Sequence, residues 1–465
     1  MNETITPSQN PIERQPIHKL LMSFAIPSII ANLSNSLYNI VDQIFIGQGI
    51  GYLGNAATNV AFPITTICLA IGLLTGIGAA SNFNLNIGRK DYQKARNTLG
   101  TAIGFILTSG LILAIFVFLN ATSLMRFFGA TDNVHPLATD YVRIIALGIP
   151  FFMMSIGGAN LVRADGSAKY SMMSVLLGAI INTILDPLFI FVFKWGIQGA
   201  ALATITGQIA SGLFIFSYFS RFNHVSFRYR DITIIPQELW NIFKLGINSL
   251  VFQLSNTVVQ ITLNNTLNAA GSQSIYGADI PMAAAGITIK INTLFLAVVI
   301  GIVQGAQPIF GVNYGARLYD RVRQTFWLVM KTLATFSFII FLIFQIFTRQ
   351  IISLFGNGDE LYFEYASHYM RTFLFMIVVS GMQIGMSNFL AAIGLGFKSA
   401  IISLNKQIIF LLPLIIFFGN IYDVKMIPYA APITDGLTFI LASFFIYRQF
   451  KKMPKGDLGI SLDYH

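Results

Sequence analysis

An amide, a carboxylate and a proline lie close together in the otherwise apolar stretch INTILDPLFIF (181–191). Asn182 and Asp186 are four residues apart and therefore share one face of a helix. Pro187 has no N–H, so the carbonyl oxygen of Thr183 loses its helical partner beside these two side chains. A carboxylate in hydrocarbon is costly, and such groups normally face protein or water and have a function.

A second acid, Asp42, lies in the first apolar segment of the chain. If that segment meets the segment around Asp186, then Asp42, Asn182, Asp186 and the free carbonyl form an oxygen-rich cluster. Two carboxylates in a low-dielectric environment cannot both stay charged without a cation. The pair is therefore a candidate site for H⁺ or Na⁺. The alternative for Asp186 is a structural role at a helix kink, but Asp42 has no neighbouring proline.

The composition is that of a membrane protein with many spans. The chain has 465 residues, of which 55% are hydrophobic and 10% charged, and its mean hydropathy is +0.68. Apolar stretches long enough to cross a bilayer recur along the chain, and we place twelve between residues 18 and 450. No P-loop, His-Glu-x-x-His or cysteine cluster occurs, and Cys68 is the only cysteine. We therefore expect neither an enzyme nor an ATPase, and no cofactor apart from a coupling ion.

Basic residues predict the orientation. With a cytoplasmic N-terminus, the opposite loops hold only four Lys or Arg, namely Arg126, Lys194, Arg349 and Lys425, and the cytoplasmic segments hold most of the rest. This bias places both termini in the cytoplasm. It also accounts for the net charge of +10 through topology and lipid headgroups, without nucleic acid. We expect a multi-pass protein of the inner (cytoplasmic) cell membrane.

An internal repeat divides the chain. NIGRKDYQKAR (86–96) and NYGARLYDRVR (313–323) share the pattern N-x-G-x-x-x-Y-x-[KR]-x-R. We expect an all-α protein of twelve transmembrane helices in two six-helix bundles, formed by residues 1–221 and 237–465 and joined by a cytoplasmic linker at 222–236. Each half has an even number of spans, so the repeats are parallel, and folds of this kind commonly place a substrate chamber between the halves.

Polar stripes mark the first span of each half. Asn32, Asn35, Asn39 and Gln43 superpose on Gln253, Asn256, Gln260 and Asn264. Both stripes could either join helices by hydrogen bonds or line a cavity. The second half lacks counterparts of Asp42 and Asp186. Lys406 and Asp435 are charged residues within its spans to which the sequence assigns no role.

Four segments together resemble the multidrug and toxic compound extrusion (MATE) family: YNIVDQIFIG (38–47), NTILDPLFIF (182–191), GAALATITGQ (199–208) and QGAQPIFGVNYGAR (304–317). The resemblance covers nearly the whole chain. It implies export of amphipathic, often cationic compounds in exchange for Na⁺ or H⁺. In the branch that resembles the DinF-type bacterial members, it implies a cation site of Asp42, Asn182, Asp186 and Thr204. Thr204 enters through the resemblance alone.

We further expect a substrate chamber and two hinges, Pro27 and Pro187. The chamber candidates are Tyr38, Asn39, Gln43, Met153, Met154, Met172, Met173, Gln260, Asn264, Lys290 and Gln304. Methionines suit varied ligands, although ordinary packing explains most of them equally well. The expected partners are small lipophilic or cationic drugs and membrane lipids, and we expect a monomer.

Two other functions remain open. A related flippase for lipid-linked oligosaccharides would need several Arg or Lys in the chamber, and Lys290 is the only deep one. A membrane scaffold or receptor would have no use for paired acids.

Overall fold

The structure, a computed structural model, describes residues 11–355 and 359–457. No β-strand occurs in this part of the chain. The helices of the first half are α1 (Pro11–Arg14), α2 (Ile17–Gly49), α3 (Tyr52–Gly88), α4 (Tyr92–Phe127), α5 (His135–Ala164), α6 (Ala168–Pro187), η1 (Leu188–Val192), α7 (Gly196–Tyr218), η2 (Phe219–Arg221) and η3 (Tyr229–Asp231). Those of the second half are α8 (Pro236–Ser272), α9 (Asp279–Gly315), α10 (Tyr319–Ile346), α11 (Thr348–Ser353), α12 (Glu360–Phe373), α13 (Ile377–Ala392), α14 (Gly396–Leu404), η4 (Asn405–Leu411), α15 (Leu412–Ile421), η5 (Val424–Tyr429) and α16 (Ala430–Lys452).

Eleven of these helices or helix runs are long and apolar enough to cross a membrane. The twelfth expected span corresponds to α8, which has 37 residues but does not reach the same hydropathy. The reason is its polar stripe, which includes Gln253, Asn256 and Gln260. The expected all-α fold with twelve membrane helices is confirmed.

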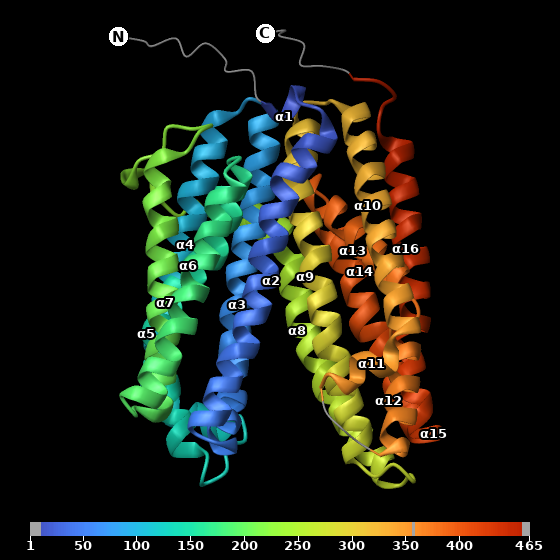
Figure 1. Cartoon of the computed structure of the whole chain (residues 1–465). Coiled ribbons are helices and arrows are strands. Elements are labelled where there is room, and N and C mark those ends of the chain that lie inside the picture. Colours follow the sequence, from blue (N-terminus) through green and yellow to red (C-terminus); the bar gives the residue numbers. More distant parts are fainter. Residues whose placement is uncertain (1–10, 356–358, 458–465) are drawn as a thin grey trace, which may run out of the picture.

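The helices form two bundles that we call the first bundle (α2–α7) and the second bundle (α8–α16) (Figure 1). Both described ends of the chain lie at the same end of the molecule. There Arg321 Nη2 donates to the carbonyl oxygen of Ile12 at 3.1 Å, and the N–H of Asp320 donates to Asp457 Oδ1 at 2.9 Å. The backbone also shows the repeat, because Lys90 and Arg317 occupy equivalent turns and have left-handed φ values of 61° and 59°.

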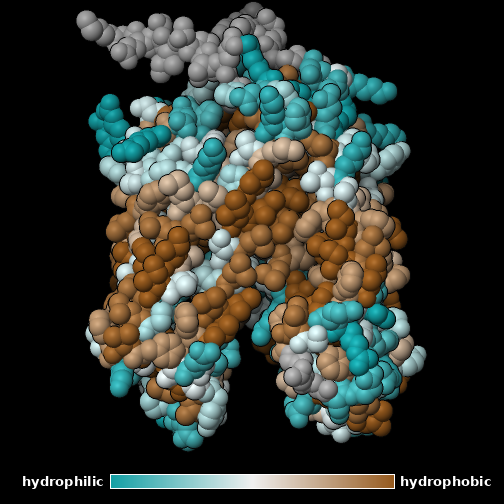
Figure 2. Space-filling model, viewed as in Figure 1, coloured by the Kyte–Doolittle hydropathy of each residue, from teal (hydrophilic) through white to brown (hydrophobic). Residues whose placement is uncertain are grey.

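The two bundles touch near the termini and separate at the opposite end. α2 packs against α9, and α3 packs against α8. A Cβ atom on Gly246 would lie 1.8 Å from the carbonyl oxygen of Leu74, and one on Gly78 would lie 2.1 Å from that of Ile242. Figure 2 shows a broad apolar band across this face of the molecule and an open cleft between the bundles at the end remote from the termini. Close packing of the helix backbones therefore closes the gap between the bundles near the termini, and we call this end of the molecule the closed side.

Polar contacts reinforce this closed side. Gln307 Nε2 donates to Ser81 Oγ at 2.9 Å, and Asn82 Nδ2 donates to Glu238 Oε2 at 2.9 Å. Each of these hydrogen bonds joins the first bundle to the second. Glu238 is buried, so its carboxylate depends on donors from the other bundle.

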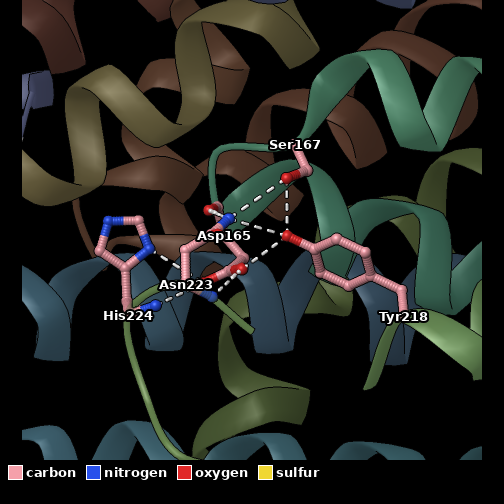
Figure 3. Close-up of polar contacts among 5 residues, drawn as sticks. All are labelled: Asp165, Ser167, Tyr218, Asn223 and His224. Carbon is pink, nitrogen blue, oxygen red and sulfur yellow. Dashed lines mark hydrogen bonds and ion pairs between the residues drawn. The ribbon is translucent and has the colours of Figure 1, made fainter. Parts of the chain in front are cut away.

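The segment after α7 is fastened to the first bundle by one buried carboxylate, Asp165 (Figure 3). Asp165 Oδ2 accepts the backbone N–H of Asn223 at 2.7 Å and the hydroxyl of Tyr218 at 2.8 Å. Asp165 Oδ1 accepts the backbone N–H of His224 at 3.1 Å and lies 2.9 Å from its Nδ1. Ser167 completes the cluster, because its Oγ lies 2.6 Å from the hydroxyl oxygen of Tyr218. The turn between α5 and α6 thus holds the start of the linker.

Substitution of Asp165 by Asn should lower thermal stability. The amide of Asn presents N–H groups where the carboxylate accepts hydrogen bonds, and a hydrogen bond to a charged group contributes about 1.5–3 kcal/mol. We expect the unfolding midpoint of the purified protein to fall by several degrees. Asp132→Asn, at an exposed position, is the matched control and should leave the midpoint unchanged. Equal midpoints for the two variants would show that Asp165 does not anchor the linker.

Candidate functional site

Helices α2, α6 and α7 bring the predicted cation ligands together. α2 packs against α6, and α6 packs against α7. The carboxylate of Asp42 faces that of Asp186 and the side chain of Asn182. All three side chains are buried, Asp186 completely. The condition set by the sequence, that the first and fifth spans meet, is therefore fulfilled.

Four oxygens of this cluster have no hydrogen-bond partner within the described part of the chain. Asp42 Oδ1, Asn182 Oδ1 and both carboxylate oxygens of Asp186 are buried without a hydrogen bond. Two ionised carboxylates cannot bond to each other, and each unsatisfied buried polar group is costly. A proton or a hard cation would satisfy these oxygens, since hard cations prefer oxygen ligands. The residues present therefore fit H⁺ or Na⁺. We call Asp42, Asn182 and Asp186 the acid cluster.

Two further residues border the acid cluster. Asn182 Nδ2 donates to Thr204 Oγ1 at 3.4 Å, so Thr204 lies beside the acid cluster, and its role as a cation ligand stays a prediction. At Pro187, α6 passes into the π-helix η1. Wider π turns of this kind occur frequently at functional sites. The proline thus marks the end of regular α-helix beside the cluster, and its role as a hinge stays a prediction.

Two tyrosines also face the acids. Tyr38 lies one turn before Asp42 on α2 and is close to both carboxylates. Tyr141 on α5 is close to both carboxylates and to Thr204. Tyr141 was not among the residues predicted from the sequence. A polar ring inside a span was the available signal, but the sequence did not show that α5 lies beside α2 and α7.

The other chamber candidates in the first half have mixed positions. Met153 and Met154 are buried in the core of the first bundle, with 0% and 2% of their surface exposed. Both side chains are enclosed by neighbouring helices, and their role in the chamber stays a prediction. Met173 is exposed and Met172 is partly buried.

Gln43 and Asn39 continue the polar stripe of α2. Gln43 Nε2 donates to Thr58 Oγ1 on α3 at 3.3 Å. Asn39 is exposed, and its Nδ2 donates to the carbonyl oxygen of Asn35 on the same helix. The stripe thus both joins helices and reaches an open surface.

In the second half, the candidates separate into three positions. Gln304 accepts a hydrogen bond from Asn32 Nδ2 at 3.0 Å and lies in the contact between the bundles. Gln260 lines a cavity of about 170 Å³ inside the second bundle. Asn264 and Lys290 are exposed and do not line this cavity.

Pro27 lies within the continuous helix α2, and a hinge there stays a prediction.

Comparison with known proteins identifies the family. The sequence model of the MatE family matches the chain twice, at residues 27–188 and 254–417. The multidrug export proteins MepA of Staphylococcus haemolyticus and of Staphylococcus aureus strain MRSA252 are each 24% identical to the chain, over 440 and 439 residues, and each alignment covers 94% of both proteins.

Among solved structures, a MOP superfamily transporter from Pyrococcus furiosus aligns with a TM-score of 0.87 and 22% identity. An outward-facing multidrug resistance MATE family transporter aligns with a TM-score of 0.88 and 22% identity. Both comparisons cover 95% of this chain and 98% of the other. The two matches of the family model include three of the four predicted cation ligands, Asp42, Asn182 and Asp186. The chain therefore belongs to the MatE family, whose members are the MATE transporters.

Proposed function

We propose that the protein is a cation-coupled multidrug efflux antiporter that exports amphipathic, often cationic compounds by alternating access. The observation that carries the coupling is the acid cluster, with its four buried oxygens that lack partners. The MepA relatives, described as multidrug export proteins, support the substrate class. The coupling ion is H⁺ or Na⁺.

The cleft fits one state of such a cycle. It opens at the end remote from the termini (Figure 2). With both termini in the cytoplasm, as the distribution of basic residues predicts, this end faces the outside of the cell, and the protein lies in the cytoplasmic membrane of a bacterium. A cation from outside then reaches Asp42 and Asp186 and neutralises them. Drug and cation must favour different states for one to drive the other.

The flippase alternative would need free basic groups for an anionic headgroup. Lys406 is the basic residue that lines the cavity of the second bundle. Its Nζ lies 2.8 Å from Asp435 Oδ1, so its charge is already neutralised. Lys290, the deep basic residue expected from the sequence, is exposed and lies off this cavity. The drug antiporter is therefore the better-supported function.

Transport by the purified protein in proteoliposomes tests this function. We expect ethidium movement to follow an inward gradient of Na⁺ or of H⁺ when the two gradients are imposed separately. The gradient that drives exchange identifies the ion, because the same carboxylates bind either one. Absence of ethidium movement under both gradients would contradict the antiporter, and movement unaffected by either gradient would contradict coupling.

A further inference from the structure

The second bundle encloses a cavity that differs in charge from the acid cluster. The helices that line it are α8, α9, α12, α13, η4, α15, η5 and α16, and its volume is about 170 Å³. The exposed side chains of Asn256, Gln260 and Thr293 are among its lining residues, so the cavity opens to the surroundings. Phe252, Phe373 and several aliphatic residues make most of its wall apolar. A cavity with these walls fits an amphipathic compound.

A buried ion pair forms the charged part of this cavity. Lys406 on η4 and Asp435 on α16 lie 2.8 Å apart, and their side chains are only 14% and 10% exposed. Lys406 Nζ also donates to Ser380 Oγ at 2.9 Å and to Gln383 Oε1 at 3.0 Å. All three N–H groups of the ammonium are therefore bonded. The pair carries no net charge, and its ammonium and carboxylate lie side by side.

Three other polar atoms on the cavity wall have no partner among the described residues. They are the hydroxyls of Tyr369 and Thr434 and the side-chain oxygen of Gln407. Tyr369 and Thr434 are completely buried, and Gln407 is 5% exposed. Native proteins normally satisfy buried polar groups with protein, water or a ligand.

We propose that this cavity binds an amphipathic zwitterion, with the ligand carboxylate on Lys406 and the ligand ammonium on Asp435. A buried ion pair is strongly destabilised when one partner is removed, because the other charge is then left unpaired. A simple anion bound to Lys406 would leave Asp435 without a partner. A simple cation bound to Asp435 would leave Lys406 without one. A ligand with both charges gives Lys406 and Asp435 a new partner each, in exchange for the ion pair between them. The proposal names a substrate class for the efflux function and in that respect rests on it.

The two halves thus hold chemically different sites at corresponding places. The acid cluster uses side chains of α6 and α7, the fifth and sixth spans of the first half, together with Asp42. The cavity pair uses the fifth and sixth spans of the second half. Two carboxylates need an external cation, whereas the ammonium of Lys406 already serves Asp435. Ion coupling and zwitterion binding can therefore reside in separate bundles.

A series of three fluorescent compounds tests the proposal on the unmodified protein. Nε-dansyl-lysine is a zwitterion, its methyl ester is a cation, and its Nα-acetyl derivative is an anion with the same fluorophore. Binding to the purified protein is followed by dansyl fluorescence. We expect the zwitterion to bind at least about tenfold more tightly than either derivative, since tenfold corresponds to about 1.4 kcal/mol. Equal affinities for the three compounds would overturn the proposal.

Variants locate the site. The double variant Lys406→Gln/Asp435→Asn removes both charges together and leaves neither one unpaired. We expect it to bind the three compounds with similar affinities. Lys331→Gln, on an exposed face of α10, is the control and should keep the preference for the zwitterion. Retention of this preference by the double variant would overturn the assignment to Lys406 and Asp435.

Binding and transport give separate outcomes. Ethidium export by a protein that shows no preference for the zwitterion would overturn the zwitterion site and leave the efflux function standing. Preferential zwitterion binding by a protein that exports nothing under any gradient would support the site and contradict the efflux function. The comparison on the unmodified protein decides the proposal even if the double variant does not fold.

Discussion

Replacement of Asp186 by Asn should abolish cation-driven export while the protein stays folded. Both carboxylate oxygens of Asp186 are buried without partners in the described structure, so they stabilise the fold little and are available to a cation. Asn keeps the size of the side chain and removes the charge. We expect ethidium exchange in proteoliposomes to fall by at least about tenfold, which corresponds to 1.4 kcal/mol of lost cation-binding free energy. The unfolding midpoint should stay equal or rise.

Asp42→Asn should reproduce this loss, and the double variant Asp42→Asn/Asp186→Asn should be no worse than either single one. Residues that bind one ion together have non-additive effects. Asp132→Asn, on an exposed turn, is the matched control and should transport like the wild type. Wild-type exchange with an unchanged ion dependence in Asp186→Asn would show that the acid cluster is not the coupling site.

The sequence predicted the acid cluster well because most of it is local. The spacing of Asn182 and Asp186 fixes their common helix face, and Pro187 marks the end of the regular helix beside them. Their proximity to Asp42 depended on a contact between spans, which the sequence could only state as a condition. Tyr141 was missed for the same reason, since only the packing of α5 brings it to the acids.

The contact between Lys406 and Asp435 could not be predicted from the sequence. Each residue alone was an unexplained charge in a span, 29 positions apart in the sequence. Lys406 lies on the π-helix η4, whose wider turns change the direction of the side chains relative to an α-helix. Hydropathy and spacing contain no signal for that change. The same limit explains Lys290, whose depth along the span was apparent but whose direction on α9 was not.

The contact between the bundles, where α3 packs against α8, should tolerate substitution poorly. A Cβ atom at Gly246 would lie 1.8 Å from the carbonyl oxygen of Leu74, which belongs to the backbone of a packed helix and cannot move aside alone. Gly246→Ala must therefore separate α3 from α8 near the termini. We expect this variant to lose the conformation with an open cleft at the remote end, and to lose transport by more than about tenfold.

Spin labels at the two tips of the cleft measure this effect. Tyr52, the first residue of α3, and Ile275, three residues after the end of α8, are highly exposed at the end remote from the termini. Replacement of the buried Cys68 by Ala leaves only the cysteines introduced at these two positions. Gly246→Ala should shift the distance between the labels to shorter values. Gly286→Ala on α9, where a Cβ meets nothing within 4 Å, should leave it unchanged. An unaltered distance between the two labels in Gly246→Ala would mean that α3 and α8 shift only close to the substituted residue. The closed side would then depend on the polar contacts of Glu238 and Gln307 and not on backbone proximity.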